Sequence, residues 1–181
     1  MAPWNVPADK WGKFLITIFK EWVKHDVGNF FIQYFDSTLA NWIDAQPGVC
    51  TLAKECGHAG VMEFNGDVYS CDHFVYPKFK LGNINKDSLT SMMYSTRQIE
   101  FGKNKWTTLP SQCKACKYLF ACNGECPKNR IIDTATGEKG LNYLCQGYYE
   151  FFDFVAPYME YMKSKLKNEE APADIMEAIR R

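Results

Sequence analysis

Eight cysteines are the residues of this chain whose type and spacing indicate chemistry. They are Cys50, Cys56, Cys71, Cys113, Cys116, Cys122, Cys126 and Cys145. Cysteine thiolates are the usual protein ligands of iron–sulfur clusters, and a cluster is commonly held by four of them. The count therefore matches two four-coordinate centres, with no cysteine left over.

Zinc and disulfides are the alternative uses of these thiols. Cys113 and Cys116 alone are compatible with a zinc knuckle, but zinc ribbons usually add a second pair of the same spacing, and here Cys122-x3-Cys126 follows. Because soft thiolates accept both metals, protein prepared in air can carry zinc. Four disulfides would suit a small secreted protein, whereas the N-terminus MAPWNVPADK has no signal-peptide pattern.

The residues around the cysteines resemble one enzyme family. The cysteine spacing resembles the SPASM domain, the auxiliary-cluster module of many radical S-adenosylmethionine enzymes. The segments NGDVYSCDHFVYP (65–77), KLGNI (80–84) and CKACKYLFACNGECPKNR (113–130) resemble anaerobic sulfatase-maturating enzymes. The Cys-x3-Cys-x2-Cys triplet that binds the cofactor-cleaving cluster is absent from this sequence. We therefore expect the C-terminal half of such an enzyme, inactive alone, with S-adenosylmethionine bound only by the full-length parent.

The resemblance also implies the ligands and a base. It places Cys50, Cys56, Cys71 and Cys126 on a first [4Fe–4S] cluster, and Cys113, Cys116, Cys122 and Cys145 on a second; the spacing alone does not fix this division. It implies that Asp72 takes a proton from the substrate, a role that partial burial would favour by raising the pKa of the carboxyl. From the sequence alone Asp72 is an ordinary solvated or turn-capping aspartate, and strand alternation would turn His73 away from it.

Four further residues lie beside these ligands in the sequence. Positive charge on Lys128 and Arg130 would raise the reduction potential of a nearby cluster, unless both are ordinary surface residues. Tyr118 and Phe120 are expected to shield a cluster from water.

The implied function is oxidation of a sulfatase cysteine or serine to Cα-formylglycine, with the clusters relaying an electron or only holding the chain. The expected partners are the missing N-terminal radical domain and the sulfatase polypeptide. Two alternatives are the SPASM domain of a ribosomal-peptide maturase and a zinc-binding structural module. With 21 basic and 21 acidic residues and no long apolar run, the chain gives no sign of nucleic acid or membrane as a partner, and we expect a cytoplasmic protein.

The hydrophobic pattern predicts the elements that position the cysteines. Helices are predicted for residues 10–25, Ser37–Ala45, Ser88–Gly102 and from Gly147 onward, the last kinked at Pro157. Trp11, Phe14, Leu15, Ile18 and Trp22 should face inward from the first helix, and Tyr148, Phe151, Phe152, Val155, Met159 and Met162 from the last. Strands are predicted for Asn29–Phe35, Phe79–Ile84 and a hairpin around Asn65-Gly66, with both turn residues at positive φ. The remaining segments are a tight loop at 110–130, a polar turn at Asp133–Gly140 and a charged linker at Lys165–Asp174.

The predicted fold class is α+β, with a small β-hairpin core and cysteine-rich cluster-binding loops, flanked by helices at both ends. We expect residues 1–45 to be a remnant of a partial barrel (helix, strand, helix). Residues 46–150 should form the auxiliary-cluster domain, and 151–181 a C-terminal helical extension. The strand at 29–35 would then be an exposed sheet edge.

Overall fold

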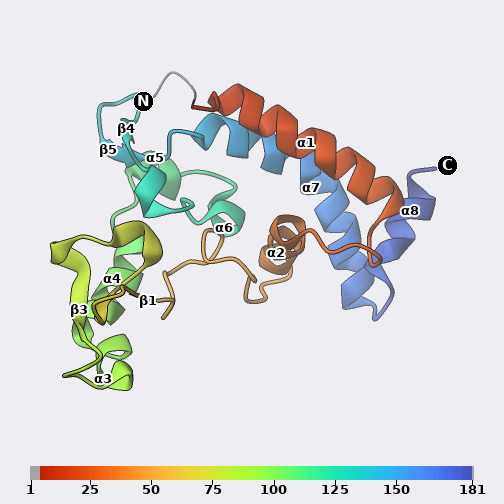
Figure 1. The fold of residues 1–181 in the computed structure, drawn as a ribbon. Helices are drawn as coiled ribbons and strands as arrows, with labels where there is room; N and C mark the ends of the chain where they lie inside the picture. Colours follow the sequence, from red (N-terminus) through yellow and green to blue (C-terminus); the bar gives the residue numbers. More distant parts are fainter. Residues whose placement is uncertain (1–4, 181) are drawn as a thin grey trace.

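Two long helices from opposite ends of the chain pack along each other in the computed structural model, which describes residues 5–180. These are α1 (Ala8–His25) and α7 (Cys145–Lys167), shown side by side in Figure 1. They cross at a pair of glycines, because a Cβ on Gly147 would collide with the Ala8 carbonyl and a Cβ on Gly12 would lie 2.7 Å from the Gly147 oxygen. The close approach lets large aromatic side chains from both helices share one core.

The helix predicted for residues 10–25 is confirmed, but its buried face is shifted. Leu15, Phe19 and Trp22 are buried, whereas Phe14 is 53% exposed and stacks on Trp11. On α7 the whole predicted face is buried: Tyr148, Phe151, Phe152, Val155, Met159 and Met162. This helix begins at Cys145 and runs through Pro157 to Lys167, into the segment predicted as a linker. The short elements η4 (Pro172–Asp174) and α8 (Ile175–Ala178) follow it.

The strand predicted for Asn29–Phe35 is wrong. After α1 the chain turns, with the Trp22 indole N–H donating to the Phe30 carbonyl at 2.8 Å, and α2 (Gln33–Trp42) begins. Phe35 then lies in the core, its ring centroid 5.2 Å from that of Phe19 and 5.4 Å from that of Trp22. Packing of this one side chain outweighs the β propensity of its neighbours.

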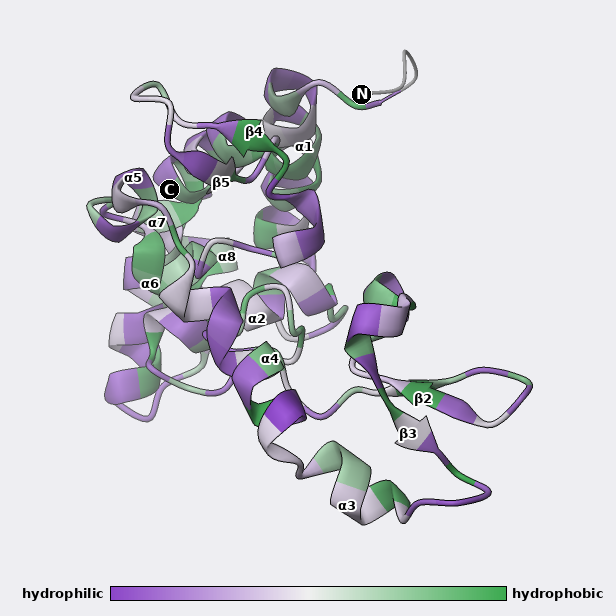
Figure 2. Cartoon of the chain, turned by 90° about the vertical axis from the view of Figure 1, so that its left-hand side faces the viewer, coloured by the Kyte–Doolittle hydropathy of each residue, from purple (hydrophilic) through white to green (hydrophobic). Residues whose placement is uncertain are grey.

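A three-stranded antiparallel sheet, in the order β1-β2-β3, lies apart from the helical core (Figure 2). Its strands are β1 (Val61–Met62), β2 (Asp67–Tyr69) and β3 (Lys80–Asn83), so the predicted hairpin and third strand are present. The turn differs from the prediction. The Gly66 N–H donates to the Glu63 carbonyl, and only Gly66 takes positive φ (82°), so Phe64 and Asn65 are the central residues.

The helix predicted for Ser88–Gly102 is two helices, α3 (Leu89–Met93) and α4 (Thr96–Thr107). Ser95 separates them, because its hydroxyl accepts the Gln98 N–H and caps α4. Met92 and Met93 pack with Val68 under the sheet.

The cysteine run contains short helices rather than only loop. They are α5 (Ser111–Lys114), α6 (Leu119–Cys122) and the 3₁₀ turn η3 (Pro127–Asn129); two further 3₁₀ turns, η1 (Asp72–Phe74) and η2 (Pro77–Phe79), follow β2. The predicted polar turn joins β4 (Ile132–Asp133) to β5 (Lys139–Leu141). Small sheets with flanking helices confirm the α+β class.

Candidate metal centres

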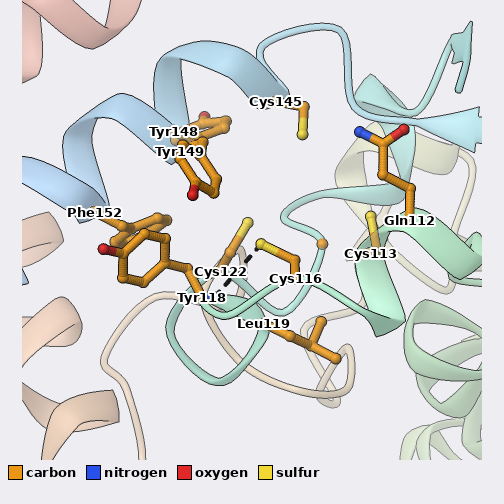
Figure 3. A pocket seen from close by; sticks show the side chains of 11 residues that line it. Gln112, Cys113, Cys116, Tyr118, Leu119, Cys122, Cys145, Tyr148, Tyr149 and Phe152 are labelled. Carbon is orange, nitrogen blue, oxygen red and sulfur yellow. Dashed lines mark hydrogen bonds between the residues drawn. The ribbon is translucent and has the colours of Figure 1, made fainter. Parts of the chain in front are cut away.

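Four cysteines line a cavity of about 210 Å³ beside the start of α7, here called the α7 cavity. They are Cys113 on α5, Cys116 in the following turn, Cys122 at the end of α6 and Cys145 at the first position of α7. Figure 3 shows their side chains around this space, with Tyr148, Tyr149 and Phe152 of α7 on one side. The run from Cys113 to Cys122 and the start of α7 thus bring four thiols to one place.

The other four cysteines line a second cavity, of about 150 Å³, here called the hairpin cavity. They are Cys50, Cys56, Cys71 and Cys126. Cys71 follows strand β2 in extended backbone, so the sheet fixes where its thiol lies. Phe74 and Phe101 supply apolar walls, in edge-to-face contact at 5.4 Å.

A left-handed turn separates the two sets of thiols. Asn123, Gly124 and Glu125 take φ of 50°, 70° and 55°, a conformation that residues other than glycine rarely adopt. The Asn123 side chain donates to the Leu52 carbonyl at 2.8 Å, and the Glu125 carboxylate accepts the Cys126 N–H. These contacts compensate the strained backbone, which carries Cys122 into one cavity and Cys126 into the other.

Burial keeps six of the eight thiols protonated when no metal is bound. Desolvation raises the pKa of Cys122 to about 12, and the pKa values of Cys71 and Cys145 to about 11. The pKa values of Cys56, Cys113 and Cys126 are also raised by burial. Since thiolates are the ligand form, metal uptake at either cavity must release protons.

The spread of the sulfurs fits a group larger than one ion. In a tetrahedral zinc site with Zn–S of 2.3 Å, the sulfurs lie about 3.8 Å apart. Within residues 5–180, only Cys71, Asp72 and His73 bring three potential metal-ligand atoms (sulfur, carboxylate oxygen or imidazole nitrogen) within 4.8 Å of one another. No three of the cysteine sulfurs in this range come this close together. The four sulfurs of each cavity are instead arranged around an open volume. The donor set of four soft thiols and this volume fit an iron–sulfur cluster.

Asp72 lies at the edge of the hairpin cavity, in the turn η1. Its side chain is 72% exposed, so the partial burial that would raise its pKa is absent. The Cys71 thiol donates to Asp72 Oδ1 at 3.2 Å, and this hydrogen bond is the main cause of a lowered pKa of Asp72. The carboxylate form therefore predominates at neutral pH.

His73 is not turned away from Asp72, because residues 72–74 form a 3₁₀ turn and not a strand. Its Nε2 lies 4.0 Å from Asp72 Oδ2, and its Nδ1 lies 3.5 Å from the Cys126 sulfur. The sequence prediction missed this residue, which joins the hairpin cavity from the same turn as Asp72.

Two buried charged residues were also missed. Lys105 is fully buried on α4, and its ammonium donates to the carbonyls of Cys50 and Thr51 at 2.7 Å and to that of Ala53. Glu125 is buried as well and accepts from Asn142 at 3.2 Å. The type of a charged residue gives no sequence signal that its side chain points inward.

Four residues predicted to influence the clusters lie next to the ligands in the sequence: Tyr118, Phe120, Lys128 and Arg130. Tyr118 lines the α7 cavity and its hydroxyl donates to Asp153 at 2.7 Å, whereas Phe120 packs against Trp42 instead. Arg130 enters the turn between the cavities, whereas Lys128 is exposed and donates to the Tyr76 hydroxyl at 2.6 Å. Of these four residues, Tyr118 lines a cavity and Arg130 contacts the turn between the two cavities.

Comparison with known families supports iron–sulfur clusters as the kind of metal group. Residues 54–117 match the SPASM family, an iron–sulfur cluster-binding domain, and this range includes four of the eight cysteines. Residues 54–117 therefore carry the sequence features of a SPASM domain. Outside the matched range, the remaining cysteines come from the segments that flank the SPASM core.

Similar proteins extend the likeness to the whole chain. A serine-type anaerobic sulfatase-maturating enzyme of Bacteroides thetaiotaomicron is 66% identical over 99% of this chain and 44% of its own length. A cysteine-type enzyme of Clostridium perfringens is 30% identical over 91% of this chain and 44% of its own. The solved structure of native anSMEcpe with bound AdoMet matches with a TM-score of 0.77 and 29% identity, over 90% of this chain and 44% of that one. The resemblance to this enzyme family is confirmed, and the chain spans less than half of the length of these relatives.

A helix that crosses a bilayer needs about 20 predominantly apolar residues. Among residues 5–180, none of the helices is both long and apolar enough to cross it.

Proposed function

We propose that this chain is the auxiliary-cluster part of an anaerobic sulfatase-maturating enzyme that oxidises a sulfatase serine to Cα-formylglycine. The observation that carries the proposal is the 66% identity to a serine-type enzyme over 180 residues. The identity to cysteine-type relatives is 30% and 31%. The two cavities, each lined by four cysteines, support the presence of iron–sulfur clusters, which this function requires.

Each cavity is proposed to hold one [4Fe–4S] cluster, and such clusters supply one-electron transfer when bound. The ligands proposed for the hairpin cavity are Cys50, Cys56, Cys71 and Cys126, and those for the α7 cavity are Cys113, Cys116, Cys122 and Cys145. The buried thiols lose their protons on loading, and Tyr118, Tyr148 and Phe152 keep water from the α7 cavity. Eight unpaired thiols suit a reducing compartment such as the cytoplasm.

Asp72 is proposed as the base that takes the substrate proton. Its carboxylate is exposed, so it is accessible from outside the hairpin cavity, and ligation of Cys71 would place it directly beside the centre there. A carboxylate positioned in this way can accept a proton from a reacting side chain.

The proposed partners are an N-terminal radical domain and the sulfatase polypeptide. The support is that relatives are more than twice as long as this chain, and that anSMEcpe has been solved with AdoMet and a bound peptide.

The test uses the full-length parent, purified without oxygen. We expect it to convert the serine of a sulfatase peptide to formylglycine, with the matched cysteine peptide as the comparison. A parent that loads iron in both cavities yet modifies neither peptide would overturn the proposed function.

A further inference from the structure

A guanidinium lies between the two candidate centres. Arg130 is half-buried, and its four hydrogen bonds all go to backbone carbonyl oxygens. Nε donates to Gly124 at 3.0 Å, and the terminal nitrogens donate to Lys105 at 2.7 Å, Glu125 at 3.2 Å and Asn123 at 3.3 Å. Three of these four acceptors form the left-handed turn that separates Cys122 from Cys126.

The anionic groups that act on Arg130 belong to both cavities. Burial lowers the pKa of Arg130. Two cysteines of the α7 cavity (Cys113 and Cys122) and two of the hairpin cavity (Cys56 and Cys126) oppose this effect, because each thiolate favours the charged guanidinium. Carbonyl oxygens solvate the guanidinium but do not neutralise its charge. The positive charge therefore attracts an anionic group bound in either cavity. Four thiolates around an iron–sulfur core form such an anion.

Neighbouring cations do not share this position. The buried Lys105 ammonium faces the Cys50–Ala53 loop, and the cysteines that act on it, Cys56 and Cys50, line only the hairpin cavity. Lys128 is exposed and lies over the rings of Tyr76 and Phe74, where water and salt screen its charge.

We propose that Arg130 is a cation shared by both centres, which raises the reduction potentials of both together and holds the turn that positions Cys122 and Cys126. A fixed positive charge near a cluster favours its more reduced, more negative state. Both reduction potentials then depend on the same side chain. The difference between them changes little, which favours electron transfer between the centres. This inference rests on the proposed occupation of both cavities by clusters.

The experiment compares three variants of the anoxically reconstituted protein: Arg130→Gln, Arg130→Lys and Lys128→Gln. Iron per chain is quantified, and the midpoint potential of each centre is followed by spectroscopic redox titration. Arg130→Gln should lower both potentials. In Arg130→Lys, which keeps the positive charge, both potentials should lie close to those of the unmodified protein. Lys128→Gln should leave both potentials unchanged. If Arg130→Gln loads no iron in either cavity while Arg130→Lys loads both, the shared role of the charge is equally supported.

Other outcomes overturn the inference. They are a shift at only one centre, an equal shift in Lys128→Gln, unchanged potentials in Arg130→Gln, equal effects of Gln and Lys, or failure of both Arg130 variants to load iron. If the unmodified protein itself takes up no cluster, the proposed function is wrong. The iron content of the unmodified protein therefore shows whether the proposed function or only the role of Arg130 has failed.

Discussion

Cys122 and Cys126 line different cavities although only Asn123, Gly124 and Glu125 separate them. All three intervening residues take positive φ, so the backbone reverses at this point. The short separation ties the geometry of one candidate centre to that of the other. A change in this turn should therefore affect both.

Gly124→Ala should lower iron uptake at both cavities. A Cβ at Gly124 would collide with the Leu109 side chain and lie 2.6 Å from an Arg130 nitrogen, in a backbone with φ of 70°. Gly137→Ala is the matched control, since Gly137 has φ of 82° and nothing within 4 Å of its added Cβ. The control should show only the backbone strain of about 1–2 kcal/mol in denaturant unfolding. Equal iron content in both variants would contradict the role of the turn.

Single cysteine substitutions should empty one cavity at a time. The unmodified protein is expected to bind about eight iron atoms, and Cys56→Ser and Cys145→Ser about four each. Cys56 lines the hairpin cavity and Cys145 the α7 cavity, so the spectra that remain should differ. Iron and sulfide analysis after anoxic purification measures this. Two variants with the same residual spectrum would rule out the proposed division of ligands.

Asp72→Asn should stop formylglycine formation in the full-length parent and leave both centres loaded. The amide has nearly the same size as the carboxylate but cannot accept a proton, and loss of a general base costs about 10²–10⁴-fold in rate. Product is measured on a sulfatase peptide, beside the iron content of the same preparation. Near-normal turnover with full iron would remove Asp72 from the mechanism.

Lys105→Gln should destabilise the fold by about 2–3 kcal/mol, because buried carbonyls lose a charged donor. The ammonium is the donor to the carbonyls of Cys50, Thr51 and Ala53. The exposed Lys103 on the same helix provides the control, Lys103→Gln, which should change stability little. Denaturant midpoints of the two variants give the comparison. Similar midpoints would mean that the Lys105 contacts contribute little net stability.

Acid should weaken the pairing of β2 with β3 through Asp67. The Lys80 ammonium lies 2.5 Å from the Asp67 carboxylate, and hydrogen bonds from Lys80 and then Asn83 lower the pKa of this carboxyl. A lowered pKa in the folded state gives stability that is present above the unfolded value of about 3.9 and is lost as the pH falls through the folded value. The thermal midpoint of Asp67→Asn should therefore fall less than that of the unmodified protein between pH 5 and pH 2. Parallel pH dependences would show that another group is responsible.

Local sequence patterns determined much of the fold. The α7 face was predictable because apolar residues recur at helical spacing, and the hairpin was predictable because glycine readily takes the positive φ of Gly66. The number of cysteines, eight, likewise indicated metal binding. Periodicity and turn residues act over a few positions, so they can be read along the chain.

Tertiary structure decided which residues meet. Phe35 joins a helix because its ring fits between Phe19 and Trp22, although its neighbours favour a strand. Arg130 is half-buried and donates to the turn between the two cavities, whereas Lys128 is exposed, although the two residues lie two positions apart in the sequence. The grouping of the thiols into two cavities depends on segments up to 76 residues apart, from Cys50 to Cys126. Side-chain direction and long-range contact are set by packing, which no local pattern encodes.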